Sequence, residues 1–564
     1  MNDDRRLLLA VLLCLGIYAG WSWMLASRRH ALPAPPPAPV AAAPAPPKPS
    51  APAAPPAAVV PVEPGRASPA APERFTTLDT PELHLVFSSR GGTLAHAVLQ
   101  NPQYRRRVDG HDLPIDLVRG PGAEGHDLET TLAGASFGQV DGLADYEPVA
   151  QVGGKAVVFR RTVGGAVIEK RYEAVAPYQL ALTVSISGAT AQGLSIGYAG
   201  QQPPKAAAGP GGFLSHFVRS YPNVATAVCR VDGQSKSSAS DKDEQVTLPA
   251  APKLGAVQFG GLDERFFVVA IAPQGDRQGS CTLSSTKSGD VRAELQLPFV
   301  AGAPLARTFG IFLGPKDLDL LQRASILPGH HEDAEMGSAV GFGFWTALCV
   351  PMLRVMQFFD RWIPNWGVAI LVLTVLMKLL LWPLTHAQYR SMEKMKALQP
   401  KMNELKKKHG EDKERLNLEM MKLYSEAKVN PLGGCLPMIL QLPIWWALYR
   451  LLGTTIQLYR EPFIAGWIND LTAPDPYYIL PLSMGATMLV TQLLAPQMAD
   501  GAQQKLMMWM MPLMMTFFFL NLPAGLNLYI VASNLLSIVQ QAWVRARTQP
   551  PGTPPTGRVA AAGA

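Results

Sequence analysis

The chain begins with a long apolar run. Leu7–Ala26 is apolar over 20 residues, which is enough to span a hydrocarbon core about 30 Å thick. A cleaved signal peptide is the alternative, but its apolar region usually has about 7–15 residues and ends at a small-residue cleavage site. Here Trp21 and Trp23 occupy the far end, where interfacial residues are common. We expect residues 1–27 to form an uncleaved transmembrane anchor.

The segment after the anchor, residues 28–73, has no periodic pattern. Pro33–Pro72 holds 16 prolines among mostly Ala and Val. Because proline lacks an amide donor and fixes φ, neither a helix nor a sheet ladder can form there. The composition predicts a semi-rigid polyproline tether.

Short alternating or β-branched runs dominate residues 74–335. Leu83–Phe87, Ala166–Ala174 and Val291–Leu297 are examples, and Gly, Pro, Asn and Asp turns separate them. No segment of helical period and useful length appears before Lys316–Ala324. The pattern predicts one large antiparallel β sandwich, a size that such domains do reach.

Two of the five cysteines, Cys229 and Cys281, lie in this β segment. If the domain is exported they can form a disulfide, and two unrelated buried thiols fit the sequence equally well. The five cysteines form no CxxC or Cys/His cluster, and the histidines of the segment are scattered. We therefore expect no metal site, no cofactor and no catalytic residues.

Beyond residue 337, long apolar segments take over. Five are about as long as a membrane span: Trp366–Leu384, Leu432–Leu452, Tyr477–Pro496, Leu506–Leu522 and Leu526–Trp543. The stretch before them differs, because its apolar residues form one stripe at helical spacing: Trp345, Leu348, Met352, Val355, Met356 and Phe359. Residues 340–362 are therefore predicted to be an amphipathic helix that lies in the membrane interface.

The distribution of Lys and Arg tests this interpretation. Residues 386–430 carry eleven of them, whereas residues 457–476 carry only Arg460. Short cytoplasmic connections are rich in Lys and Arg, so 386–430 should be cytoplasmic. Six spans with an interfacial 340–362 satisfy this and put the β domain outside. A seventh span would move the basic connection outside or the large domain inside.

The chain is therefore expected to be a polytopic α-helical membrane protein with six transmembrane helices, a large all-β domain outside and both termini in the cytoplasm. The basic connection itself predicts two helices, 387–408 and 411–428, broken at His409 and Gly410. A solvated helical hairpin and a docking arm for headgroups, RNA or an emerging chain fit this composition equally well.

Composition and charge agree with this division into two unlike halves. Charged residues make up 16% of the chain, against about 25% in soluble domains, and they are scarce after Phe342 except in the basic connection. A single compact soluble enzyme is thereby excluded. The 20 Phe, 11 Trp and 14 Tyr exclude disorder throughout. The placement of the net charge of +7 matters more than its size.

One charged residue, Lys378, stands inside an apolar span, with Thr374 one turn earlier on the same face. Its stem could lift the ammonium to the cytoplasmic interface near Pro383, or the ammonium could face a water-filled cavity. The two interpretations are equally open. No Asp or Glu occurs in any predicted span, which argues against an ion-coupled transporter.

Several motifs make the membrane half more specific. Asn430–Pro437, followed by Gln441–Pro443, resembles the third-span signature of the YidC-type membrane protein insertases. Further matches occur in the same order and spacing: Trp382–Thr385, Met395–Pro400, Asp475–Pro481, Pro523–Tyr529 and Ser533 with Asn534. They run through residues 364–545. The anchor, the tether, the β domain and Phe312–Asp317 are similar to the Gram-negative form of the family, so the resemblance covers nearly the whole chain.

The resemblance implies an insertase and chaperone, not an enzyme, that inserts and helps fold bacterial inner-membrane proteins, alone or with the Sec translocon. Five core helices in 364–545 would enclose a hydrophilic groove that is open to the cytoplasm and lipid and closed to the outside. The β domain would be a periplasmic supersandwich similar to sugar mutarotases, and 546–564 a disordered tail. Expected partners are nascent clients, the ribosome, the signal-recognition machinery and membrane lipids, with no small-molecule substrate.

The resemblance also assigns roles to individual residues. Polar groove residues would be Lys378, Thr374, Tyr529, Asn527 and Gln441. The apolar segment of a client would slide along Trp445, Met484 and Phe518. The cytoplasmic hairpin would receive clients and the ribosome through basic residues: Arg390, Lys394, Lys401, Lys406, Lys407 and Lys408. The chain departs from the family pattern at Lys378, where many members have Arg, and at Ile530, where a second Tyr is common.

Two other classes of protein can be distinguished from an insertase. A transporter would need coupling-ion ligands or internal repeats in its spans, and the sequence shows neither. An exported carbohydrate-active domain on a membrane anchor would work without residues 337–564, so a truncation to 1–330 separates it from an insertase.

Overall fold

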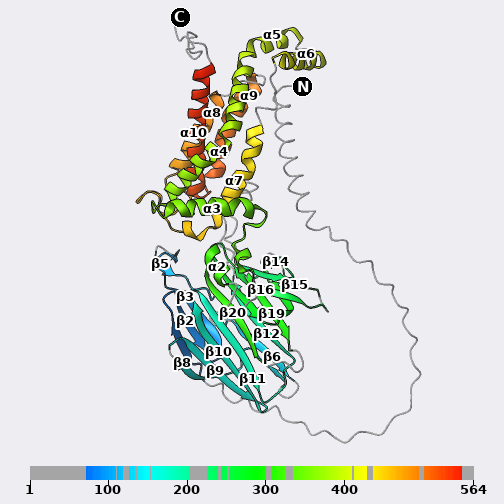
Figure 1. Ribbon diagram of the computed structural model, residues 1–564, viewed down its shortest axis with the longest axis vertical. Helices are drawn as coiled ribbons and strands as arrows, with labels where there is room; N and C mark the ends of the chain where they lie inside the picture. Colours follow the sequence, from blue (N-terminus) through cyan, green and yellow to red (C-terminus); the bar gives the residue numbers. More distant parts are fainter. Residues whose placement is uncertain are drawn as a thin grey trace, which may run out of the picture. The chain divides into compact units, whose positions relative to one another are not determined.

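In the computed structural model, the described residues form a β domain and a helical region (Figure 1). They comprise residues 72–548 without 109–110, 119–125, 135–137, 153, 202–224, 239–242, 251–252, 300–305, 325–333, 410–411, 428–435 and 495–500. The predicted anchor and almost all of the tether lie outside the described residues. Residues 549–564, which make up most of the predicted disordered tail, also lie outside the described residues. The first three residues of that tail, 546–548, are helical.

The β domain consists of antiparallel strands. β1–β2–β3 form one small sheet, β4 and β5 pair with each other, and the remaining strands form one large sheet. The strands are β1 (Phe75–Asp79), β2 (Leu83–Ser88), β3 (Thr93–Leu99), β4 (Arg105–Val108), β5 (His111–Pro114), β6 (Glu129–Gly134), β7 (Gly138–Val140), β8 (Glu147–Val152), β9 (Ala156–Val163), β10 (Ala166–Ala176), β11 (Gln179–Ser187), β12 (Gly193–Gln201), β13 (Thr226–Val231), β14 (Gln234–Ser238), β15 (Glu244–Leu248), β16 (Gly255–Asp263), β17 (Phe267–Gln274), β18 (Gln278–Ser285), β19 (Asp290–Pro298) and β20 (Ala306–Pro315).

The predicted alternation appears in the burial of these strands. In β10, every second residue from Ala166 to Tyr172 is buried, as expected when side chains point alternately to the two faces. β17 is instead buried along its whole length, and β16 and β20 pair with its two edges. Helix α2 (Leu318–Ala324) lies where the sequence predicted the first helical segment. The prediction of a large β domain is confirmed.

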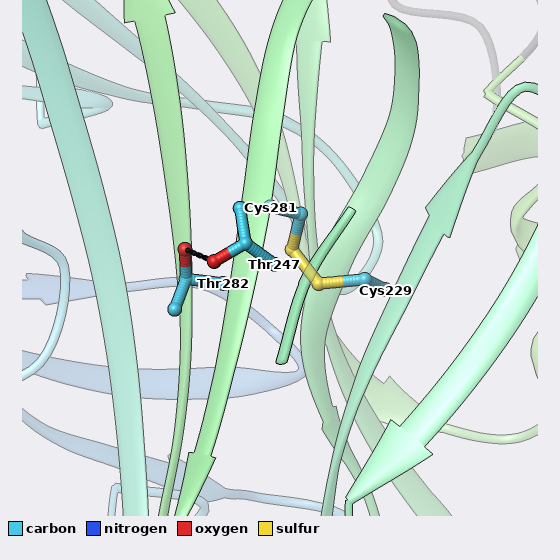
Figure 2. The surroundings of a disulfide bond; sticks show 4 residues. All are labelled: Cys229, Thr247, Cys281 and Thr282. Carbon is cyan, nitrogen blue, oxygen red and sulfur yellow. Dashed lines mark hydrogen bonds between the residues drawn. A yellow bond between two sulfur atoms is a disulfide. The ribbon is translucent and has the colours of Figure 1, made fainter. Parts of the chain in front are cut away.

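Cys229 and Cys281 form a disulfide between β13 and β18 (Figure 2). Their Cα atoms are 6.2 Å apart and both side chains are fully buried. Next to the disulfide, the hydroxyl of Thr282 in β18 forms a hydrogen bond of 3.0 Å with the hydroxyl of Thr247 in the paired strand β15. Of the two arrangements that the sequence left open, the structure therefore contains the paired one.

The helical region contains α3 (Thr346–Asp360), α4 (Trp366–Ala397), α5 (Gln399–His409), α6 (Lys413–Glu426), α7 (Leu436–Thr454), α8 (Ile479–Leu494), α9 (Gly501–Phe519) and α10 (Ala524–Thr548). By length and composition, one helix in the described part of the chain, Trp366–Met395, could cross a membrane. Ile479–Leu493 and Trp509–Phe519 are shorter apolar helices. The prediction of six spans therefore stays a prediction.

The inward face of helix α3 follows the predicted stripe except at one residue. Met352 and Met356 are buried, and Trp345, Val355 and Phe359 pack against the core. Leu348 is instead 41% exposed. The flanking aromatic residues Phe344 and Trp362 are exposed, as aromatic residues at a membrane interface would be.

The first arm of the predicted cytoplasmic hairpin is not a separate helix. α4 continues without interruption from Trp366 to Ala397, and α5 then covers only Gln399–His409. Residues 384–397 contain neither Gly nor Pro, so nothing ends α4 after Pro383. The break falls at Leu398, and Pro400 stands in the first turn of α5, where proline is tolerated because its missing amide hydrogen is not needed within the helix.

The loop between α7 and α8 fixes where the neighbouring helices begin. Asp475 is fully buried, and its carboxylate accepts hydrogen bonds from the Trp467 indole (2.8 Å) and the Leu480 amide (2.7 Å), which caps α8. The carbonyls of Leu471 and Ala473 accept from the first amides of α10 at 2.9 and 2.7 Å. This loop therefore holds the start of α10 next to that of α8.

Candidate functional site

Polar side chains recur at helical spacing along one face of α10. Ser533, Ser537 and Gln540 are four and three residues apart, so they lie one above the other on the helix. Lys378 of α4 donates a hydrogen bond of 2.7 Å to Ser537 Oγ. One turn further along, Gln540 Nε2 donates to Thr385 Oγ1 at 2.9 Å. The α4–α10 seam is therefore polar within two largely apolar helices.

The same helix carries polar contacts to two other helices. Asn534 Nδ2 donates to Thr487 Oγ1 of α8 at 3.1 Å. Gln441 Nε2 of α7 donates to the Tyr529 hydroxyl at 2.9 Å. Figure 1 shows α4, α7, α8 and α10 gathered in one bundle. Polar residues of α10 thus bond to each of the other three helices.

Lys378 has an unusual environment for a cation. It is partly buried, and within the described ranges its ammonium forms no ion pair with an acidic side chain. Its bonded partner is a neutral hydroxyl. The ammonium therefore bonds to the neighbouring helix within the bundle, which argues against snorkelling to the interface.

Two of the predicted groove residues are occupied by contacts within the protein. Thr374 is fully buried, and its hydroxyl donates to the Ile370 carbonyl of the preceding turn at 2.7 Å. Asn527 is also fully buried, and its Nδ2 donates to the Phe519 carbonyl at 3.1 Å. Asn527 Oδ1 is buried without a hydrogen-bond partner. Of the two residues, Asn527 therefore has the side-chain oxygen without a hydrogen-bond partner in the described part of the chain.

The three residues expected to guide the apolar part of a client have different exposures. Trp445 and Phe518 are partly buried, whereas Met484 is only 1% exposed. The Trp445 indole N–H is buried without a hydrogen-bond partner. Other large apolar side chains on the same helices are exposed: Trp446, Leu482, Trp509, Leu513 and Phe517.

The hairpin residues lie on two helices and on the end of α4. Arg390 and Lys394 are exposed on α4, and Lys401, Lys407 and Lys408 are exposed on α5. The Lys406 side chain lies outside the described residues. A cavity of about 350 Å³ between α5 and α6 is lined by both signs of charge: Lys401, Lys408, Lys422, Glu404, Glu419 and Glu426. The hairpin therefore presents mixed charge rather than a purely basic surface.

Sequence reasoning missed Ser537 and Gln540, although it included their partners Lys378 and Thr385 in the argument. The available signal was the spacing of Ser533, Ser537 and Gln540 on a helix that is otherwise mostly apolar. In the described part of the chain, no group of His, Cys, Asp and Glu side chains could hold a metal ion. The polar face of α10 is thus the candidate functional site.

Comparisons with known proteins agree with the assignment of the two halves. A family model described as 60Kd inner membrane protein matches residues 358–551, and one described as YidC periplasmic domain matches residues 76–355. A membrane protein insertase YidC from Anaeromyxobacter dehalogenans (strain 2CP-C) is 38% identical over 572 residues, and the alignment covers 99% of both chains.

Another relative named membrane protein insertase YidC, from Geobacter metallireducens, is 31% identical and is covered to 98% of its length by 96% of this chain. Among solved structures, an active YidC insertase with its first transmembrane domain resolved matches 82% of this chain and 91% of its own. That match has 18% identity and a TM-score of 0.35, so the assignment rests on the sequence matches.

Proposed function

The chain belongs to the YidC family of membrane protein insertases, and we propose that it inserts clients through a polar intramembrane groove in which Lys378 supplies the positive charge. As a family member it is a non-enzymatic insertase of the inner membrane with a periplasmic domain. The observation that carries the groove proposal is the bond from Lys378 to a neutral hydroxyl on the polar face of α10.

The mechanism follows from the cost of moving polar groups into lipid. A hydrophilic segment that enters a bilayer loses its hydrogen bonds to water, which costs several kcal/mol for each unpaired group. The hydroxyls and amides of α10 and its partners lower that cost over part of the bilayer. Lys378 attracts an acidic residue in the segment, since the groove has no described acid of its own. Partition of the client's apolar segment into lipid, past Trp445, Met484 and Phe518, then drives release.

The proposal includes the topology of the chain. Six spans, counting the anchor at 1–27, place both termini and the basic hairpin in the cytoplasm and the β domain in the periplasm. The eleven Lys and Arg of residues 386–430, against one in 457–476, support this orientation. The hairpin would then receive clients, the ribosome and the signal-recognition machinery from the cytoplasm. The groove would act alone or beside the Sec translocon.

The decisive test compares Lys378→Ala and Lys378→Arg in reconstituted liposomes. Two clients are used that differ only in the charge of the translocated segment, one acidic and one neutral. Lys378→Ala should lower insertion of the acidic client by roughly tenfold to a hundredfold, because a hydrogen bond to a charged group is worth about 1.5–3 kcal/mol. Lys378→Arg keeps the charge and should insert both clients.

Arg361→Ala is the control, because it removes a cation from an exposed position after α3, outside both the groove helices and the hairpin. It should leave the ratio of acidic to neutral insertion unchanged. Equal insertion of the acidic client by Lys378→Ala and the native chain would refute the groove-charge proposal.

A further inference from the structure

We infer that Ser537 is a positioning residue that holds the Lys378 ammonium at the middle of the groove, where the acidic side chain of a client meets it. The inference rests on the proposed function, because it concerns how the same site captures its substrate. It assigns a role to a residue on α10 that contacts Lys378 directly.

The hydrogen bonds around Ser537 have a consistent direction. Its hydroxyl donates to the Ser533 carbonyl of the preceding turn at 2.9 Å. The hydroxyl proton is thereby used, and the oxygen lone pairs are free to accept from Lys378 Nζ at 2.7 Å. Ser537 therefore acts as an acceptor that is held in place by its own helix.

Lys378 and Ser537 lie at about the same distance from the first residues of their helices, so the bond between them runs across the bundle rather than along it. Lys378 lies twelve residues after Trp366, where α4 begins, and Ser537 lies thirteen residues after Ala524, where α10 begins. At about 1.5 Å per residue, both lie roughly 18–20 Å from the starts of their helices. A bond between them keeps the ammonium at that depth.

The direction of the Lys378 side chain adds to this. In an α-helix, each Cα–Cβ bond tilts toward the N-terminal end. The N-terminal end of α4 is the outer end in the proposed topology, so the lysine stem begins by pointing away from the cytoplasmic interface. Reaching that interface would require the side chain to turn back along its own helix.

The next polar partner toward the cytoplasm is already occupied. Gln540 lies one turn beyond Ser537 on the same face, but its amide is bonded to Thr385 at 2.9 Å, and both side chains are buried. The ammonium therefore has Ser537 as its hydroxyl partner on this seam. An ammonium has three N–H donors, so this contact leaves two for a client carboxylate.

The test measures insertion of the same acidic and neutral clients by full-length Ser537→Ala in liposomes. Without the hydroxyl, the ammonium is no longer fixed at that depth, and insertion of the acidic client should fall about fivefold, as expected for the loss of one hydrogen bond. Insertion of the neutral client should stay at the native level, which also shows that the variant folds. Ser537→Thr keeps a hydroxyl and should restore acidic insertion.

Two further variants separate positioning from a structural role. Ser537→Ala combined with Lys378→Ala should be no worse than Lys378→Ala alone, because Ser537 acts only through the lysine. Thr491→Val removes a hydroxyl of α8 that donates to the Met488 carbonyl of its own helix at 2.7 Å, and it should leave the acidic-to-neutral ratio unchanged.

The outcomes distinguish this inference from the proposed function. If Lys378→Ala lowers acidic insertion but Ser537→Ala does not, the positioning role of Ser537 is overturned and the groove charge stands. A loss of neutral insertion equal to that of acidic insertion in Ser537→Ala would also overturn it, since a packing defect would affect both clients. If Lys378→Ala itself has no charge-dependent effect, the proposed function fails first.

Discussion

A lysine is buried in the core of the β domain, where the strand pattern calls for an apolar residue. Lys170 is fully buried on the inward face of β10, and its ammonium donates to the Gly91 carbonyl. Two residues further on the same face, the Tyr172 hydroxyl donates to the Gly92 carbonyl at 2.7 Å. Both glycines have positive φ, 72° and 54°. The two side chains therefore donate hydrogen bonds to carbonyls of a tight turn that would otherwise be buried without partners.

Lys170 makes the stability of the β domain depend on pH. Burial lowers the pKa of Lys170 from 10.5 to about 7. Between these values the unfolded chain keeps the proton that the folded chain has released, so the free energy of unfolding should rise with pH. The slope is at most about 1.4 kcal/mol per pH unit. Pulse proteolysis of the full chain in urea, between about pH 8 and 9.5, measures it.

Lys170→Met should flatten this dependence, whereas Lys155→Met, at an exposed position of the same domain, should retain it. The pH range avoids the opposite effect of Asp127, whose pKa is raised by burial from 3.8 to about 8. The Asp127 carboxyl lowers stability as pH rises through the range below about 8. A slope in Lys170→Met equal to that of the native chain would contradict the assignment.

At the scale of elements, the disulfide links two strands covalently within the core of the β domain. It joins β13 to β18 across a separation of 52 residues. Closing a loop of that length in the unfolded chain is worth at most about 4 kcal/mol in the chain-entropy model. Addition of a reductant should therefore lower the midpoint of unfolding by urea, as measured by pulse proteolysis.

The double variant Cys229→Ala with Cys281→Ala should start at the lower midpoint and no longer respond to reductant. Cys349→Ala is the control, because Cys349 is a buried free thiol, and this variant should remain sensitive. An unchanged native midpoint under full reduction would show that the disulfide adds little stability.

The types and limits of elements followed the sequence where one local rule decided them. Alternation identified β10. α6 begins at Lys413, two residues after the predicted start, because the Asp412 carboxylate accepts a 3.0 Å hydrogen bond from the Arg415 amide and caps the helix. Within the hairpin, α5 ends at His409, where the break was predicted. The first arm is shorter than predicted, because α4 continues to Ala397. In α3, Leu348 alone departs from the predicted stripe, because periodicity does not specify which neighbouring element covers each residue of a face.

Contacts between elements were less predictable than the elements. Lys378 was identified because a charge in an apolar run is visible in the sequence. Ser537 was not, because a serine in a helix is ordinary until the helix that lies beside it is known. The same holds for Thr374, whose hydroxyl could equally well have faced a client or, as found, its own backbone. Side-chain partners between helices depend on packing, which periodicity does not specify.

For the whole molecule, the two halves make separable predictions. The polar contacts proposed to form the groove join α10 to α4, α7 and α8. All of these helices follow residue 364. The β domain contributes none of them. A chain truncated to residues 1–330 should therefore reach the membrane through its predicted anchor and insert no client. Insertion in liposomes and sedimentation with membranes measure the two properties.

The truncated chain also decides between the insertase and a tethered periplasmic domain. The tethered-domain hypothesis requires activity to survive in residues 1–330, whereas the groove mechanism requires it to disappear. The full chain with Lys378→Ala is the matched control, because it keeps every helix and loses only one charge. It should still insert the neutral client, while the truncated chain should insert neither client. Insertion of either client by residues 1–330 would show that the helices after residue 337 are dispensable and that the groove is not the route.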